Sequence, residues 1–125
     1  MDIQELVRAQ RAYFLSGATR PYAFRMEQLK KLQQALRSNE ALLEQAMYQD
    51  FRKAPMEVYM CETGMVLEEL RFHLKHLKGW MRERAVPTPL AQFHAKSFVS
   101  PEPYGVALII SPWNYPVQLC LSPLV

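Results

Sequence analysis

The sequence predicts a mainly helical fold that ends in the first strand, loop and helix of an α/β domain. Three observations support this fold class. Apolar residues recur at helical spacing from residue 2 to residue 79. The composition changes at Pro87, and five of the nine prolines fall between Pro87 and Pro112. Val106–Ile110 is apolar on both faces, which is typical of a central strand that helices cover on both sides.

The first part of the chain is expected to form four helices, separated by residue types that start or stop helices. Asp2, followed three residues later by Glu5, resembles a capping box. Gly17 suits a left-handed C-terminal stop. The other expected boundaries are Thr19 as a cap with Pro21 in the first turn of the second helix, Ser38 or Asn39 before the third, Pro55 before the fourth and Gly79 at its end or bend. The apolar stripes are most simply packing surfaces and give no functional signal.

The second part of the chain is expected to contain strands and turns. Gln92–Ser100 alternates loosely as a strand does, and the turn at Pro101–Gly105 would let it pair with Val106–Ile110. Ser111–Pro116 is predicted to be a loop whose last residue, Pro116, suits the first turn of a helix. This order of strand, polar loop and helix is the first piece of a mononucleotide-binding unit. Because no further strand and helix follow, we expect the unit to be truncated on its C-terminal side.

Composition and charge exclude several classes of protein. The net charge is +3, and the basic residues are interleaved with acidic ones, so we expect no basic patch for nucleic acid. No apolar run approaches the roughly 18 residues of a membrane span. The N-terminus is polar and begins a helix pattern, which is unlike a signal peptide. We therefore expect a cytoplasmic protein.

Cysteine and histidine residues predict no metal site. Cys61 and Cys120 lie far apart and form no CxxC pair or His/Cys cluster, so they are expected to be buried thiols of a reduced intracellular protein. His73 and His76 are three residues apart and could share a metal, but no third ligand lies nearby in the sequence. We expect both to be ordinary helix residues, and Trp80 to pack at the helix end.

A motif near the C-terminal end carries the strongest functional signal. Glu102–Val106 followed by Ile109–Pro116 is similar to the E-P-x-G-V…P-W-N-[YF]-P motif of the aldehyde dehydrogenase superfamily. Gly17–Pro21 and Val66–Glu69 resemble the class 3, or fatty-aldehyde-like, branch. Ser111-Pro112 departs from that branch, where a small residue and Ala or Thr are common. The resemblance covers essentially all 125 residues, but only about the first quarter of a family chain.

This resemblance implies an α/β protein with a Rossmann-like cofactor domain. The present chain would hold the N-terminal helical segment (1–86), a linker with a strand and turn (87–104) and the truncated start of the dinucleotide-binding domain (105–125). The resemblance also implies NAD or NADP as the cofactor, an aldehyde as the substrate and a homodimer of the full-length protein. No metal is implied.

Asn114 is the residue on which the implied chemistry depends. In the family a cysteine thiolate attacks the aldehyde carbonyl, the adduct passes hydride to the nicotinamide, and a glutamate activates water to release the acid. The resemblance places the amide of Asn114 against the negative oxygen of the first adduct, where an uncharged N–H donor is suitable. The alternative is a loop asparagine that caps the helix beginning near Pro116.

The resemblance also assigns binding residues. The backbone at Ser111, Pro112 and Trp113 is expected to lie along the cofactor near its ribose, although Trp113 could also be a core aromatic. Tyr115 is expected in the wall of the substrate tunnel, and Met65 is placed there by its position on the fourth helix.

The nucleophile and the base of the family come from later segments. Neither Cys61 nor Cys120 lies in the Gly-rich context of that nucleophile. We therefore expect this chain to be the inactive N-terminal portion of an NAD(P)-dependent aldehyde dehydrogenase. Two alternatives are a helical protein-interaction module without catalytic activity and a small independent protein from a shortened gene. The motif at Trp113–Pro116 favours the enzyme, because a helical adaptor has no need of it.

Overall fold

The structure is a computed structural model that describes residues 2–125. Its helices are α1 (Ile3–Leu15), α2 (Tyr22–Ser38), α3 (Glu40–Phe51), α4 (Pro55–Val58), α5 (Gly64–Trp80) and α6 (Pro116–Leu121). A π-helical turn, η1 (Tyr59–Thr63), joins α4 to α5, and a 3-10 turn, η2 (Leu90–Gln92), lies between two short strands, β1 (Arg84–Val86) and β2 (Ser97–Val99). The prediction of a mainly helical chain is confirmed.

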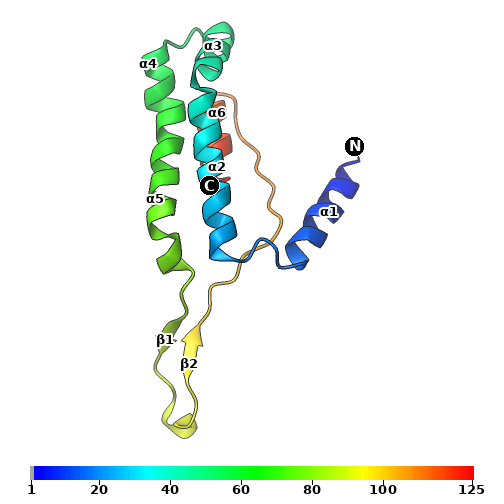
Figure 1. The fold of residues 1–125 in the computed structure, drawn as a ribbon, viewed down its shortest axis with the longest axis vertical. Helices are drawn as coiled ribbons and strands as arrows, with labels where there is room; N and C mark the ends of the chain where they lie inside the picture. Colours follow the sequence, from blue (N-terminus) through cyan, green and yellow to red (C-terminus); the bar gives the residue numbers. More distant parts are fainter. Residues whose placement is uncertain (1) are drawn as a thin grey trace.

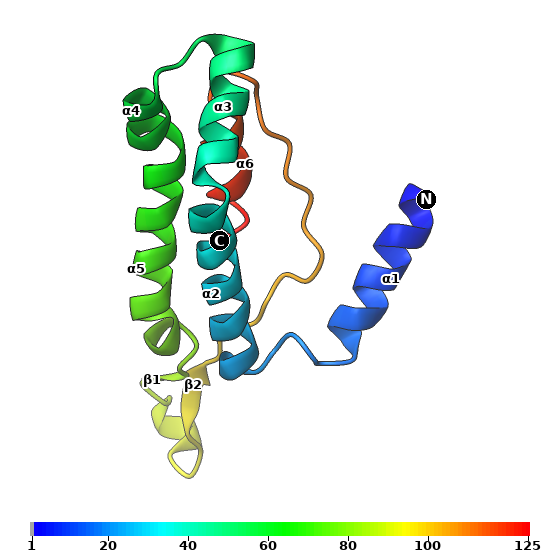
Figure 2. The ribbon, with the colours of Figure 1, turned by 45° about the horizontal axis from the view of Figure 1, so that its top comes forward.

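The long helices form an elongated column. α2 and α3 follow one another along one side of it, and α4 and α5 run beside them (Figure 1). The hairpin of β1 and β2 extends beyond one end of the column, and α1 projects away from it in both views (Figure 2). The chain after β2 then runs back along the column to α6, which lies beside α2. The end of the described chain is thereby brought against α2 and α5.

The core lies between α2, α5 and α6. Leu36 of α2 and Val66 and Leu70 of α5 are buried and in contact with one another. The partly buried hydrophobic residues packed against them are Leu29, Leu32, Leu67, Leu121 and Val125. This core is small, and α1 contributes no buried residue to it. The packing of α6 onto α2 and α5 places the loop before α6 at the end of the column.

Several expected helix boundaries are confirmed. The side chain of Asp2 accepts a hydrogen bond from the backbone N–H of Gln4, and Gly17 has the left-handed φ of 78° that its position as a stop requires. Pro55 and Pro116 both occupy the first turn of a helix, α4 and α6. Pro has no N–H to lose there, which explains the placement.

Other boundary predictions were wrong in detail. Pro21, and not Thr19, is the residue before α2, and no side chain caps that helix. Arg25 Nε instead donates to the carbonyl of Thr19 at 3.0 Å, so the backbone of that residue is used rather than its hydroxyl. Gly79 lies inside α5, which ends one residue later at Trp80. The expected fourth helix is also interrupted by η1, so it occurs as two helices, α4 and α5.

The expected strand pairing was also wrong. Only Ser97–Val99 of the segment Gln92–Ser100 is a strand, and it pairs antiparallel with Arg84–Val86, which precedes it in the chain. Thr88 contributes to the hairpin, because its Oγ1 accepts the N–H of Ser97 at 3.1 Å. The upstream strand is only three residues long and begins with a charged residue, so it has no strand-like apolar pattern.

Val106–Ile110 forms no strand in the described chain, contrary to prediction. Leu108 and Ile110 are each 84% exposed. Within residues 2–125, no backbone–backbone hydrogen bond outside helices and strands involves this segment. The helices and strands of the described chain therefore do not bury the apolar side chains of Leu108 and Ile110. A strand needs a neighbour for its backbone groups, and the hairpin does not provide one.

We expect the isolated chain to self-associate. An uncharged apolar segment with free backbone groups is the kind that pairs with a second copy. Light scattering at rising protein concentration should give a mass above that of one chain. Leu108→Lys, which places a charge on the exposed segment, should lower that mass towards the monomer. A concentration-independent monomer with strongly protected amides at Leu108 and Ile109 in hydrogen exchange would contradict this expectation.

None of the helices between residues 2 and 125 combines the length and the apolar character that crossing a membrane requires.

Candidate functional site

A buried ion pair lies beneath the loop that carries the motif. Lys53 Nζ is 2.7 Å from Glu62 Oε1, and the two side chains are only 11% and 0% exposed. Lys53 follows Arg52, which ends α3 in a left-handed conformation with φ 60°. Glu62 lies on η1. Two segments that leave the same end of the column therefore bring opposite charges together out of water.

Both members of the pair also bind the backbone around α6. Lys53 Nζ donates to the carbonyl oxygen of Asn114 at 3.0 Å. The second carboxylate oxygen of Glu62, Oε2, accepts the backbone N–H groups of Val117 and Gln118 at 3.1 and 3.0 Å. These are N–H groups of the first turn of a helix, which have no partner inside the helix. Glu62 thus caps α6 from a distant segment of the chain.

This arrangement does not support the capping alternative for Asn114. No side chain of the preceding loop makes a cap hydrogen bond to α6, and the first-turn N–H groups are bound by Glu62. Asn114 itself is exposed, and its side-chain amide makes no hydrogen bond within residues 2–125. Its backbone is held while its amide is left accessible.

The shape of η1 places Glu62 in this position. The N–H of Gly64 bonds to the carbonyl of Tyr59, five residues earlier, which is the wider turn of a π-helix. A Cβ added to Gly64 would overlap that carbonyl oxygen, closer than real Cβ atoms approach any atom. Glycine is therefore required for the turn that carries Glu62.

Gly64→Ala is accordingly expected to destabilise the chain by roughly 1–3 kcal/mol, because the extra methyl group forces the backbone apart. Urea unfolding followed by circular dichroism, at one fixed protein concentration, measures the change. Gly79→Ala is the matched control, because a Cβ there meets nothing within 4 Å and α5 is helical at that residue. That substitution should stabilise by about 0.5–1 kcal/mol. Equal effects of the two substitutions would contradict the steric explanation.

Tyr115 and Met65 line a common pocket. The pocket has a volume of about 220 Å³, and its other lining residues are Met60, Cys61 and Gln118. Lys53 Nζ lies 4.5 Å from the ring centroid of Tyr115, so the ion pair is also next to a residue that lines this pocket. The lining is mainly apolar, which suits the carbon chain of a ligand better than a charged group.

Ser111, Pro112 and Trp113 are not part of that pocket. Ser111 is half-buried, Pro112 is exposed and Trp113 is 85% exposed. Trp113 is therefore not a core aromatic of the described chain. The cysteines were also predicted to be buried, and this was wrong: Cys61 is half-buried and Cys120 is exposed. Both are free thiols.

The histidines occupy one face of α5 with two aromatic side chains. His76 Nδ1 lies 2.8 Å from the carbonyl oxygen of Phe72, and its ring stacks on Trp80 at 5.8 Å between centroids. Across residues 2–125 no group of three or more His, Cys, Asp or Glu side chains could hold a metal ion. Trp80 packs on the helix end, as expected, although it stays 44% exposed.

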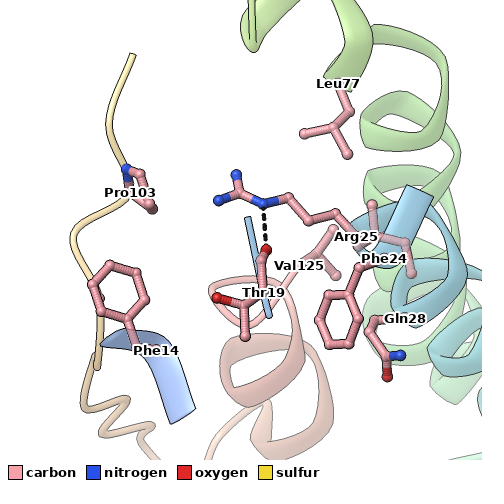
Figure 3. A pocket seen from close by; sticks show the side chains of 10 residues that line it. Phe14, Thr19, Phe24, Arg25, Gln28, Leu77, Pro103 and Val125 are labelled. Carbon is pink, nitrogen blue, oxygen red and sulfur yellow. Dashed lines mark hydrogen bonds between the residues drawn. The ribbon is translucent and has the colours of Figure 1, made fainter. Parts of the chain in front are cut away.

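A second cavity, of about 320 Å³, lies where the turn between α1 and α2 approaches residues 103–105. Figure 3 shows Phe14, Phe24 and Leu77 around it, with Arg25 bonded to Thr19. Gly105, the glycine of the E-P-x-G-V motif, has φ 103° and would bring a Cβ to 3.3 Å from the Phe14 ring. The positive φ of Gly105 favours glycine there, because residues with a side chain rarely adopt it even where there is space.

Sequence analysis missed Lys53 and Glu62. Their partners lie 61 and 55 residues away in the chain, at Asn114 and Val117. Charged residues are common on predicted helix surfaces, so neither has a local pattern that separates it from the other 25 charged residues. Only the folded chain shows that these two are buried together.

Comparisons with known proteins give matches over nearly all of this chain. The model of the aldehyde dehydrogenase family matches residues 1–125. The 4,4'-diaponeurosporen-aldehyde dehydrogenase of Staphylococcus aureus is 41% identical over 98% of this chain and 27% of its own length. Aldehyde dehydrogenase family 3 member B1 of Bos taurus is 43% identical over 92% of this chain and 25% of its own length. These relatives are consistent with the predicted class 3 branch.

A solved structure, the substrate-bound state of Staphylococcus aureus AldH, matches with a TM-score of 0.92. The two sequences are 42% identical. The match includes 99% of this chain and 27% of the chain in the solved structure. The chain thus spans about a quarter of the length of the relatives that it matches. Sequence, motif and fold agree, and the chain belongs to the aldehyde dehydrogenase family.

Proposed function

We propose that this chain supplies the N-terminal part of an NAD(P)-dependent enzyme that oxidises aldehydes to carboxylic acids. Membership of the family supports this activity. The observation that carries the proposal is the state of Asn114, whose backbone is held by Lys53 while its side-chain amide is exposed and free of hydrogen bonds to residues 2–125. That is the state in which a side chain is available to a substrate.

Asn114 would donate an N–H to the oxygen of the substrate. When a thiolate attacks an aldehyde carbonyl, a C–S bond forms and the π electron pair moves onto oxygen, which becomes negative. A fixed amide N–H stabilises that charge more than the neutral carbonyl, and it therefore lowers the barrier. The comparison of Asn114→Ala with the unchanged protein, in an active enzyme that contains this chain, tests the proposal. A chimera in which this chain replaces the matching segment of the Staphylococcus aureus relative can be used once its aldehyde oxidation has been measured.

Ser111, Pro112 and Trp113 would contact the cofactor near its ribose. The fit rests on accessibility, since these residues are exposed or half-buried, and no backbone–backbone hydrogen bond to residues 2–125 occupies them. Flat, exposed Trp113 and free backbone groups suit an extended dinucleotide. The chemistry that NAD or NADP supplies when bound is the acceptance of a hydride.

Tyr115 and Met65 would form part of the wall along which the aldehyde chain lies. Their shared apolar pocket supports this assignment. We also propose that the chain consists of a helical segment (1–86), a linker with a strand and turn (87–104) and the start of the dinucleotide-binding domain (105–125). The complete protein would be a homodimer in the cytoplasm. The alternative of a helical interaction module gains no support from the free amide of Asn114.

We expect these 125 residues alone to be inactive as an aldehyde dehydrogenase. Neither Cys61 nor Cys120 has the sequence context of the family nucleophile, which lies in a later segment of the family chain. The assay is formation of NADH or NADPH with several aldehydes at high protein concentration. Activity that survives stringent purification and disappears in Cys120→Ser would show that the nucleophile lies in this chain.

A further inference from the structure

The pair Lys53–Glu62 has no part in the chemistry proposed above, yet it is buried and both of its charged groups make hydrogen bonds. The ammonium group of Lys53 binds Glu62 and the carbonyl of Asn114. The carboxylate of Glu62 binds Lys53 and the two N–H groups that begin α6. The four contacts range from 2.7 to 3.1 Å. They connect the end of α3, η1, the motif loop and α6 at one point.

A donor for a developing negative charge must be placed accurately. A misplacement of about 1 Å can cost 100-fold in rate, because the hydrogen bond is made to a position that only the transition state occupies. The amide of Asn114 has no hydrogen bond of its own within the described chain, so its position follows from its backbone. That backbone is bound at the carbonyl of Asn114 by Lys53 and, three and four residues later, by Glu62.

The two attachments need one hydrogen-bond donor and one acceptor in the interior, and Lys53 and Glu62 supply them. A carbonyl needs a donor and helix N–H groups need an acceptor, so two apolar side chains would leave the loop and α6 unbound. An apolar pair of similar volume often costs a protein no stability, which indicates that stability alone does not require charge here. The opposite charges cancel, so the pair binds the loop without placing a net charge beside the site.

We propose that Lys53 and Glu62 are positioning residues that hold Asn114 where its amide meets the substrate oxygen. This inference rests on the proposed role of Asn114. Lys53 acts on the loop directly through the carbonyl of Asn114, and Glu62 acts by orienting Lys53 and by fixing the N-terminus of α6.

A double-mutant cycle in an active enzyme that contains this chain tests the proposal. Lys53→Met removes the donor and keeps a linear side chain. It should lower kcat by roughly 10- to 100-fold when Asn114 is present. In the Asn114→Ala background the same substitution should lower kcat less than about twofold, since there is no amide left to position. KM for the cofactor should change little in either background.

The cycle separates this inference from the proposed function. If Asn114→Ala alone leaves kcat near normal, the proposed role of Asn114 is wrong. If Asn114→Ala lowers kcat but Lys53→Met either has no effect or lowers it equally in both backgrounds, the positioning role is wrong. An equal loss in both backgrounds is what a purely structural role predicts.

Lys31→Met is the matched control. Lys31 makes an ion pair of the same length, 2.7 Å, with Glu27, but both side chains are at least 60% exposed on α2. It should leave kcat unchanged. If Lys53→Met does not fold, the cycle is run with Lys53→Met combined with Glu62→Gln, which leaves no unpaired charge and keeps an acceptor for Val117 and Gln118. The same non-additivity with Asn114→Ala is expected, and an additive loss overturns the proposal.

Discussion

Asn114→Ala is expected to lower kcat by roughly 100- to 1000-fold in an active enzyme that contains this chain, or about 3–4 kcal/mol of transition-state stabilisation. The binding of NAD or NADP should be nearly unchanged, because the amide is proposed to meet the substrate oxygen. Steady-state kinetics with a saturating aldehyde, together with a separate titration of the cofactor, gives both quantities.

The chain offers a control for this substitution. Its other asparagine, Asn39, uses its side-chain amide to bind the carbonyl of Ala35 at 2.8 Å, at the junction of α2 and α3. Asn39→Ala should lower the melting temperature slightly and leave kcat unchanged. An Asn114→Ala enzyme with near-normal kcat and a much lower melting temperature would instead mean that Asn114 is a structural residue of the loop.

Removal of Glu62 is expected to have the largest effect on stability. Glu62→Leu leaves Lys53 as an unpaired charge in the interior and also leaves the N–H groups of Val117 and Gln118 without their acceptor. Breaking one partner of a buried pair costs about 3–5 kcal/mol. Urea unfolding followed by circular dichroism measures this loss. Hydrogen exchange at Val117 and Gln118 should also become faster, because their N–H groups are no longer bound.

Glu62→Gln separates the two contributions of the carboxylate. It keeps an oxygen for the N–H groups of α6 but removes the charge that faces Lys53, so it should lose less stability than Glu62→Leu and keep slower exchange at Val117. The surface pair provides a second comparison. The hydrogen bond and charge of Lys31 lower the pKa of Glu27, but this pair is exposed. Glu27→Ala should therefore cause little change. A loss as large as that of Glu62→Leu would contradict the role of burial.

Two glycines differ in how much of their role can be predicted from neighbouring residues. Gly17 was predicted to stop a helix, and it does so with a positive φ, because a stop of this kind depends on one residue and its immediate neighbours. Gly64 has an ordinary helical φ, and its requirement arises from the carbonyl of Tyr59 at the π-turn. No residue pattern in that helix distinguishes a π-turn from an α-turn.

The strands could not be predicted from local composition. Val106–Ile110 has the composition of a buried strand, yet Leu108 and Ile110 are exposed, because burial depends on neighbours that composition does not reveal. Arg84–Val86 lacks that composition and is a strand, because β2 is within reach after the intervening turn. Strand formation in this chain was decided by which partner was available.

The amino-acid sequence by itself determined the helices with their proline starts, the family and the position of Asn114 in its motif. Helical periodicity and motifs are properties of neighbouring residues, so they can be read without a fold. The tertiary structure alone decided that Lys53 and Glu62 meet beneath Asn114, and that a carboxylate from η1 caps α6. The contacts of this pair with Asn114, Val117 and Gln118 join residues more than 50 positions apart, and they form only because α6 packs against α2 and α5.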